Sequence, residues 1–324
     1  MTVRSAPQLA IVVDALVKRF GLTTALGGVS FDVKGGELFG FIGPDGAGKT
    51  TLFRILATLL VPDAGRAEVL GLEVTANLWP LRRRVGYMAG RFSLYPDLSV
   101  RENLDFFASV FGTTVEREYA QIEPIYNQIE PFASRRAADL SGGMKQKLAL
   151  CCALVHRPDI LFLDEPTTGV DAVSRREFWD LLASLKASGL TIVVSTPYMD
   201  EAARCDRIAL IQKGRVLAID TPDAVTRSFS RPMLTVHAAD RHAALGLARS
   251  YPDADWVYPF GESLHFTDRR VNIAGDVLAG ELQAYLRSHG MSDAEVSDTP
   301  ATIEDVFIDR MGAPESVPEP GAAA

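Results

Sequence analysis

The segment 43–51 has the residue types and spacing of a loop that binds phosphate groups. It matches the pattern G-x-x-x-x-G-K-[ST] at every fixed position and consists of Gly43, Pro44, Asp45, Gly46, Ala47, Gly48, Lys49, Thr50 and Thr51. Its glycines allow the backbone to turn N–H groups toward phosphate oxygens. Lys49 is expected to reach the β- and γ-phosphates of a nucleotide, and Thr50 to bind Mg²⁺. The alternative is a glycine-rich turn with no ligand.

The residues around this loop predict the elements that would position it. Segment 38–42 is a short apolar run, as in a buried strand, and segment 50–60 repeats apolar residues at helical spacing. A helix that begins at the loop directs the positive end of its dipole at a bound anion. This strand–loop–helix context argues against a turn without a ligand.

Two carboxylates end a second apolar run. Segment 160–163 has the length and composition of a strand buried in a parallel sheet, and Asp164 and Glu165 follow it. Beside a phosphate loop, Asp164 is expected to bind Mg²⁺, and Glu165 to orient or deprotonate the attacking water. Taken alone, this pattern also fits a strand that ends in a solvated acid, so the functional interpretation depends on the phosphate loop.

A third segment, 140–147, reads Leu-Ser-Gly-Gly-Met-Lys-Gln-Lys and resembles the LSGGQ-type signature of the ATP-binding cassette (ABC) family. Ser141 is expected to cap the helix that follows, and Gly142 and Gly143 leave room for the close approach of a ligand. The resemblance implies that Ser141, Gly142 and Gly143 complete an ATP site on a second subunit. An ordinary serine-capped helix is the alternative.

The resemblance extends over roughly the first two thirds of the chain. Phe20 lies where the family carries an aromatic residue that stacks on adenine, with a core phenylalanine as the alternative. Segment 166–171 resembles the loop that touches the partner subunit in this family. Asp171 within it also suits the N-cap of the next helix, which could be its whole role.

Two positions depart from the family pattern. Gly90 stands where the family usually has a glutamine that meets Mg²⁺ and the attacking water, and Pro197 stands where it usually has a histidine that contacts the γ-phosphate. Glycine has no side chain, and proline has neither a side-chain donor nor a backbone N–H. The sequence therefore predicts a degenerate site that hydrolyses ATP slowly alone and acts with a partner cassette. Substitution by Arg91, Thr196 or a water molecule is the alternative.

The order of the patterns predicts an α/β protein with two domains. Residues 1–222 are expected to form a P-loop NTPase (RecA-like) core with an N-terminal antiparallel β subdomain and a helical subdomain inserted at about 90–157, as in ABC ATPases. Residues 223–312 alternate strand and helix patterns and predict a small α+β C-terminal domain. Residues 313–324 are rich in Pro, Gly and Ala and are expected to form a disordered tail.

Composition limits the partners and the location of the chain. The 324 residues carry a formal net charge of −8, which argues against nucleic acid as a main partner. No apolar run approaches the ~18 residues that span a bilayer, and the first residues lack a signal-peptide core. The chain is therefore expected in the cytoplasm, and the resemblance to ABC ATPases implies a peripheral place at the inner face of the cell membrane. The basic run 82–84 is expected to be a solvated face, with contact to a membrane protein as the alternative.

The resemblance implies an ATPase that uses ATP and Mg²⁺ to power an ABC transporter. Segment 302–308 resembles a C-terminal motif of drug- and lipid-exporter ATPases, which favours an exporter. The expected partners are transmembrane permease subunits and a second ABC ATPase subunit, either another copy or a relative. ATP binding would close this dimer, and hydrolysis would let it open. The alternatives are a soluble, non-transport ABC ATPase acting on ribosomes or DNA and a regulatory ATP-binding module with little turnover.

Overall fold

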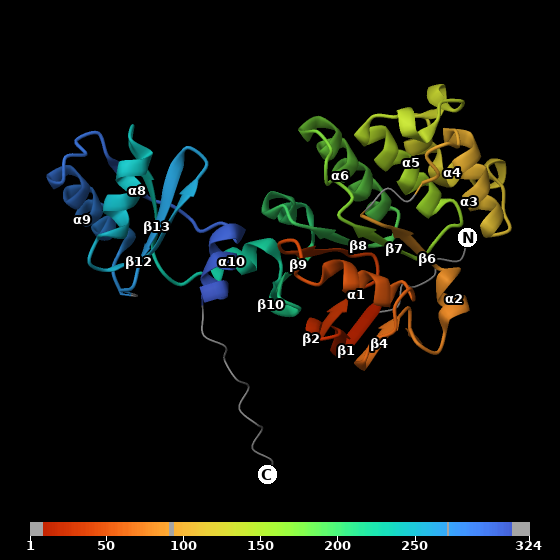
Figure 1. Cartoon of the computed structure of the whole chain (residues 1–324), viewed down its shortest axis with the longest axis horizontal. Helices are drawn as coiled ribbons and strands as arrows, with labels where there is room; N and C mark the ends of the chain where they lie inside the picture. Colours follow the sequence, from red (N-terminus) through yellow and green to blue (C-terminus); the bar gives the residue numbers. More distant parts are fainter. Residues whose placement is uncertain (1–8, 91–93, 271, 313–324) are drawn as a thin grey trace, which may run out of the picture. The chain divides into compact units, whose positions relative to one another are not determined.

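The computed structural model describes residues 9–90, 94–270 and 272–312, and the chain divides into two compact units, 1–222 and 223–324 (Figure 1). Among these described residues, the first unit contains two sheets, and the second unit contains one. Arg91 and the predicted tail 313–324 lie outside the described residues.

A six-stranded sheet with the order β10-β9-β3-β8-β7-β6 forms the centre of the first unit. Its strands are β3 (Leu38–Ile42), β6 (Val85–Met88), β7 (Ile160–Asp164), β8 (Thr191–Thr196), β9 (Arg207–Gln212) and β10 (Arg215–Asp220). All are parallel except β10, which pairs antiparallel with β9. Every residue of β3, β7 and β8 is buried, as expected for parallel strands covered on both faces. The predicted α/β core is confirmed.

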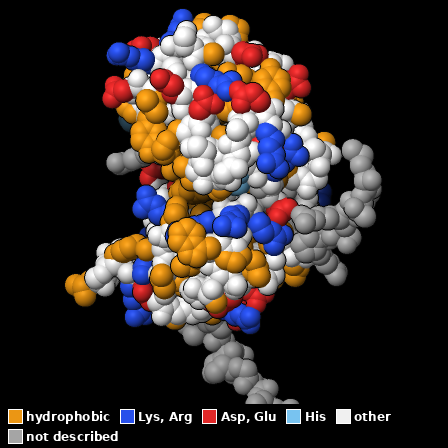
Figure 2. Space-filling view, turned by 90° about the vertical axis from the view of Figure 1, so that its right-hand side faces the viewer, with side chains coloured by type: hydrophobic (Ala, Val, Ile, Leu, Met, Phe, Trp, Pro, Cys, Tyr) orange, Lys and Arg blue, Asp and Glu red, His pale blue; other side chains and the backbone are white. Residues whose placement is uncertain are grey.

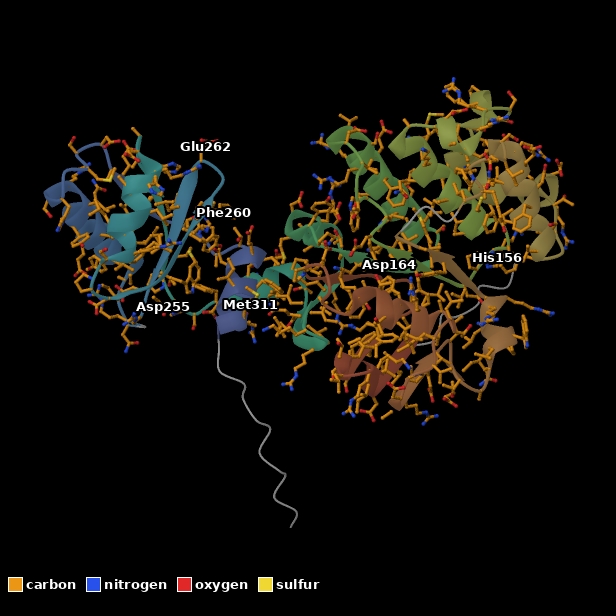
Figure 3. All side chains as sticks on the ribbon, in the orientation of Figure 1. His156, Asp164, Asp255, Phe260, Glu262 and Met311 are labelled. Atoms are coloured by element: carbon orange, nitrogen blue, oxygen red, sulfur yellow. The ribbon has the colours of Figure 1, made fainter. Side chains whose placement is uncertain are left out.

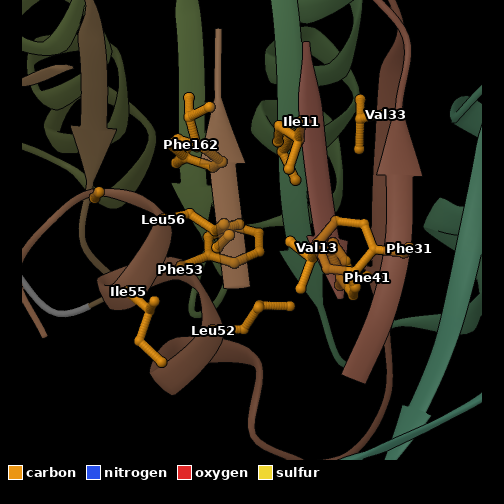
Figure 4. Packing of buried hydrophobic residues seen from close by; sticks show 14 of the residues in the cluster. Ile11, Val13, Phe31, Val33, Phe41, Leu52, Phe53, Ile55, Leu56 and Phe162 are labelled. Carbon is orange, nitrogen blue, oxygen red and sulfur yellow. The ribbon is translucent and has the colours of Figure 1, made fainter. Parts of the chain in front are cut away.

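A second sheet, with the order β2-β1-β4-β5, is antiparallel and forms the predicted β subdomain. Its strands are β1 (Ile11–Phe20), β2 (Thr23–Val33), β4 (Ala64–Val69) and β5 (Leu72–Glu73). Helix α1 (Lys49–Leu56) contributes its apolar side chains to a core shared with both sheets (Figure 4). The helix ends at Leu56, earlier than the predicted Leu60, because Thr58 turns the chain with a φ of 62°.

The helical subdomain is built from α3, α4 and α5, which contact one another and group together in Figure 1. Ser99 and Glu102 form the capping box that starts α3. The helices and 3₁₀ turns of the first unit not yet given are α2 (Leu78–Arg82), α3 (Val100–Val110), α4 (Val115–Tyr126), η1 (Glu130–Phe132), η2 (Ala137–Asp139), α5 (Gly142–Leu154), α6 (Ala172–Ala187) and η3 (Met199–Arg204). Asp171 accepts hydrogen bonds at the N-terminus of α6 and so fills the predicted capping role.

The second unit is an α+β fold with one antiparallel sheet of order β12-β13-β11-β14. Its elements are α7 (Pro222–Arg227), β11 (Met233–His237), α8 (Arg241–Arg249), β12 (Ala254–Phe260), β13 (Ser263–Asp268), α9 (Gly275–Ser288), β14 (Glu295–Asp298) and α10 (Ile303–Gly312). Helices α8 and α9 pack on this sheet around a separate apolar core. Helix α10 is held by the buried Asp305, which accepts hydrogen bonds from His265, Tyr258 and Thr302. Burial alone would raise the pKa of Asp305, but these bonds outweigh it and lower that pKa.

Candidate functional site

The loop 43–51 joins β3 to α1, as the sequence predicts. Lys49 is only 3% exposed, and its Nζ donates to the carbonyl oxygens of Gly43 at 2.8 Å and Pro44 at 3.0 Å. Pro44, Asp45 and Gly46 are exposed, so the crest of the loop is open to a ligand. A Cβ at Gly48 would lie 2.5 Å from the carbonyl oxygen of Ala25, and its φ of 103° also requires glycine. The loop is therefore fixed both by its backbone conformation and by close packing against β2.

The two carboxylates lie beside this loop. Asp164 is the last residue of β7 and is 1% exposed, and Figure 3 labels it at the centre of the first unit. Glu165 Oε1 lies 3.0 Å from Lys49 Nζ. A phosphate group that binds Lys49 must therefore compete with the carboxylate of Glu165. The structure brings together Lys49, Asp164 and Glu165, three residues singled out from the sequence.

Gly90 packs against the backbone of Asp164 and the Cβ of Glu165. A Cβ built at Gly90 would be 2.8 Å from the carbonyl oxygen of Asp164 and 3.6 Å from Glu165 Cβ. Real Cβ atoms essentially never come within 3.0 Å of a backbone oxygen, so a larger residue here would require the backbone to shift. Gly90 therefore lacks the polar side chain that the family usually has at this position, and it packs closely against the backbone of Asp164.

The end of β8 contains a serine whose role the sequence analysis missed. Ser195 is fully buried and donates a hydrogen bond of 2.7 Å from its Oγ to Asp164 Oδ1. The signal in the sequence is a polar residue at the end of an apolar strand, Thr191–Thr196. That signal identifies a partner only once the β7–β8 register is known, in which Asp164 pairs with Ser195.

Thr196 does not offer a free hydroxyl in place of the histidine. Its Oγ1 donates to Glu201 and accepts from the backbone N–H of Tyr198 at 3.1 Å. Glu201 is 3% exposed and also accepts a 2.8 Å hydrogen bond from Thr167. This buried carboxylate ties the loop that follows Glu165 to the end of β8, directly before Pro197.

The segment with Ser141 lies at the N-terminus of α5. Ser141 Oγ accepts a 3.3 Å hydrogen bond from the N–H of Met144, which confirms the predicted cap. Ser141 and Gly142 are exposed, whereas Gly143 is buried and its Cβ would lie 2.7 Å from Ser174 Oγ. Gly143 is thus required by the packing of α5 on α6. Within one chain, the described residues show no hydrogen bond or ion pair between this segment and Lys49.

Phe20 ends β1 on the surface of the antiparallel sheet. Its side chain is 51% exposed, and Lys18 Nζ lies 5.6 Å from the ring centroid. The alternative of a core phenylalanine is therefore wrong. The exposed ring can stack on a planar ligand.

A groove of about 500 Å³ lies on the first unit, among α2, β6, α3, α5 and the residues that follow α1. Figure 2 shows apolar side chains gathered along a hollow on this face, with basic side chains beside it. Trp79 and Val110 line the groove and are 71% and 62% exposed. A contiguous apolar groove on a surface is typical of an interaction site.

The basic residues beside the groove are not a uniform solvated face. Arg82 donates from Nε to Thr58 Oγ1 at 2.9 Å and lies 5.2 Å from the ring centroid of Trp79. Arg84 forms an ion pair of 2.6 Å with Asp159. The prediction of a solvated run therefore does not hold for Arg82, whereas Arg83 is exposed at the rim and the Arg84 side chain is 40% exposed.

Two polar groups lie in the wall of the groove. His156 stacks on Phe111 with ring centroids 3.7 Å apart, and its Nε2 lies 3.1 Å from the carbonyl oxygen of Val85. Burial lowers the pKa of His156, so a neutral ring donates from Nε2 to Val85. His156 Nδ1 and the Tyr87 hydroxyl are buried without a hydrogen-bond partner among the described residues. Burial, with the charge of Asp164, raises the pKa of Tyr87.

None of the described helices combines the length and the apolar character needed to cross a membrane.

Comparisons with known proteins agree with this geometry. The model of the ABC transporter family matches residues 26–168. The probable multidrug ABC transporter ATP-binding protein YbhF of Escherichia coli K12 is 47% identical over 228 residues, which cover 68% of this chain and 39% of YbhF. The Nod factor export ATP-binding protein I of Paraburkholderia xenovorans LB400 is 36% identical over 312 residues, covering 93% of this chain and 97% of that protein.

Solved structures show the same fold. The cbiO1 protein of Clostridium perfringens, part of the ABC transporter complex cbiONQ, superposes with a TM-score of 0.61 at 26% identity, covering 68% of this chain and 92% of that one. A dimeric ATP-binding cassette, MJ0796, bound to ADP and phosphate gives a TM-score of 0.59 at 26% identity, with coverage of 65% and 98%. The chain therefore belongs to the ATP-binding proteins of ABC transporters, a family of ATPases built on the P-loop NTPase fold.

Proposed function

We propose that the chain is the ATP-binding subunit of an exporter-type ABC transporter and powers separate permease subunits by ATP-driven closure of a cassette dimer. The observation that carries this proposal is the meeting of Lys49, Asp164 and Glu165 at the phosphate loop. The names of two relatives, one a multidrug transporter protein and the other a Nod factor export protein, support export. The chain spans 39% of the length of YbhF, so it corresponds to only part of that relative.

The residues at the phosphate loop fit a nucleotide with Mg²⁺. Mg²⁺ usually keeps several waters and binds through one or two protein oxygens together with substrate phosphates. Thr50 in the first turn of α1 and Asp164 at the end of β7 are the proposed protein ligands. Lys49 and Thr51 contact phosphates, Phe20 stacks on adenine, and Glu165 activates the attacking water. Mg²⁺ held there would neutralise charge on the β- and γ-phosphates.

Two chains are proposed to form each complete site. Ser141 and Gly142 are exposed at the N-terminus of α5, where a ligand of a neighbouring subunit can reach them. Each subunit would offer Lys49 and Asp164 to one ATP and the Ser141 segment to the other. The dimeric cassette with ADP and phosphate among the structural relatives supports this arrangement. The partner is a second copy or a related cassette.

Turnover by the chain alone is proposed to be slow. Gly90 and Pro197 supply no side-chain donor to the attacking water or the γ-phosphate. The hydroxyl of Thr196 is already engaged with Glu201. A partner cassette with a glutamine and a histidine at the corresponding positions would turn over the second ATP, and the site with Gly90 would hold its nucleotide longer.

The groove with Trp79 is proposed to receive the permease. Its walls are apolar, and Arg83 at the rim can meet an acidic group. These properties fit a short, amphipathic segment of a membrane protein rather than a nucleic acid. They also favour a transporter over a soluble, non-transport ATPase.

Introducing a charge into the groove is expected to detach the chain from its permease. In detergent-solubilised membranes of producing cells, the native chain should co-purify with an integral membrane protein. Trp79→Asp should lower the recovery of that protein by about tenfold, because a carboxylate would have to be desolvated in an apolar groove. Leu22→Asp is the matched control, since Leu22 is a fully exposed apolar residue outside the groove. Equal recovery with both variants, or native chain found with ribosomes instead of membranes, would contradict the proposal.

A further inference from the structure

Ser195 lies where the two carboxylates of the site meet the neighbouring strand. The parallel β7–β8 pair places it beside Asp164, and it is fully buried. Its Oγ donates to Asp164 Oδ1 at 2.7 Å and accepts from the backbone N–H of Glu165 at 3.0 Å. One hydroxyl group therefore contacts both residues to which metal binding and water activation are assigned.

The backbone at Glu165 needs support of this kind. Glu165 has a φ of 51°, a left-handed conformation that costs energy for a residue with a Cβ. Its N–H is shared between the Oγ and the carbonyl oxygen of Ser195, each 3.0 Å away. These bonds fix the turn from which the Glu165 side chain reaches Lys49.

Few other side chains hold these carboxylates. Within residues 9–90, 94–270 and 272–312, the side-chain donors to these two carboxylates are the hydroxyl of Ser195, which donates to Asp164, and the ammonium of Lys49, which lies 3.0 Å from Glu165 Oε1. The proposed role of Lys49 is to bind phosphates, so its contact with Glu165 changes when a nucleotide binds. Ser195 is therefore the side-chain contact that does not depend on the nucleotide.

We propose that Ser195 is a positioning residue of the nucleotide site, a role that rests on the proposed function. Its hydroxyl restricts the rotation of the Asp164 carboxylate that binds Mg²⁺ and holds the backbone of Glu165 in place. Groups that hydrogen-bond to metal ligands typically contribute 10–100-fold to metal affinity or activity. A hydroxyl that only satisfied a buried neighbour would affect stability and leave the Mg²⁺ dependence of ATP binding unchanged.

The test measures the ATP affinity of the full chain by calorimetry, in excess EDTA and over a series of Mg²⁺ concentrations. Ser195→Ala is expected to keep its ATP affinity in EDTA and to need about tenfold more Mg²⁺ for the half-maximal effect. Ser195→Cys, similar in size but a weak donor, should behave in the same way. Ser195→Thr keeps a hydroxyl and should restore the native Mg²⁺ dependence.

Thr191→Val provides the matched control on the same strand. Thr191 lies at the opposite end of β8 and is also buried. Its Oγ1 accepts a 2.9 Å hydrogen bond from the backbone N–H of Gly36. This variant should keep the native Mg²⁺ dependence. The proposal is overturned if Ser195→Ala and Ser195→Cys keep the native Mg²⁺ dependence, or if they lose ATP affinity equally with and without Mg²⁺. A native chain that binds no ATP would overturn the proposed function instead.

Discussion

Replacing Lys49 with alanine is expected to lower the affinity for ATP by about 30-fold or more. The side chain is buried, and its ammonium lies among the carbonyl oxygens of Gly43 and Pro44 and the carboxylate of Glu165. Truncating one partner of a buried, hydrogen-bonded charge pair typically costs about 2–5 kcal/mol, and 1.4 kcal/mol corresponds to a factor of ten. Calorimetric titration with Mg-ATP gives the affinity directly.

The control for this variant is Lys186→Ala. Lys186 also forms an ion pair with a carboxylate, that of Asp206 at 2.5 Å, but its side chain is 35% exposed and lies at the end of α6. Its loss should leave the ATP affinity unchanged. Equal affinities of the native chain and a folded Lys49→Ala variant would show that the nucleotide does not bind at this loop.

Replacing Glu165 with glutamine is expected to reduce ATP hydrolysis by about 10²–10⁴-fold without weakening ATP binding. The loss follows from the removal of the proposed general base, since such a base typically contributes a factor of that size. The affinity should rise, because Glu165 Oε1 lies 3.0 Å from Lys49 Nζ and competes with phosphate for the ammonium group. The two readouts therefore move in opposite directions.

Binding and single-turnover hydrolysis of the Glu165→Gln variant provide these readouts. The control is Glu281→Gln, which neutralises a carboxylate paired with Arg270 at 2.9 Å in the second unit. A variant of Glu165 that binds ATP more weakly than the native chain would contradict the competition between carboxylate and phosphate. Undiminished hydrolysis would remove Glu165 from the proposed mechanism.

The parts of the site that the sequence predicts are those set by local patterns. The strand before the phosphate loop, the helix after it and the caps at Ser141 and Asp171 depend on residues within a few positions of one another. For the same reason the strand that ends at Asp164 is recognised as an apolar run. Short-range rules are sufficient for these elements.

The parts that the sequence analysis missed depend on contacts between distant segments. Ser195 gains its role from the register of two parallel strands, and Glu201 from hydrogen bonds to Thr167 and Thr196. Arg82 is held by Thr58, which follows α1. Strand β14 was also missed, because its residues are polar and largely exposed and it is recognised only by its pairing with β11.

The packing around Gly90 limits the side chains that can replace it. Because a Cβ at this position would approach the carbonyl oxygen of Asp164 to 2.8 Å, introducing glutamine here would disturb the strand end that carries the carboxylates. Pro197 does not carry this restriction, and a histidine there would regain both a side-chain donor and a backbone N–H. Pro197→His is therefore the better variant for testing whether the missing polar groups limit turnover.

The most direct test of the account is the steady-state rate of ATP hydrolysis by the purified native chain and by Pro197→His. The rate of Lys49→Ala gives the background hydrolysis to be subtracted. Loss of a donor that acts mainly in the transition state typically costs about 10²–10³-fold in rate. We predict that the native chain binds Mg-ATP but turns over well below about 1 s⁻¹, the lower end of typical enzyme rates, and that Pro197→His raises the rate at least about tenfold with little change in ATP affinity. A native rate of about 1 s⁻¹ or more that Pro197→His leaves unchanged would contradict the account.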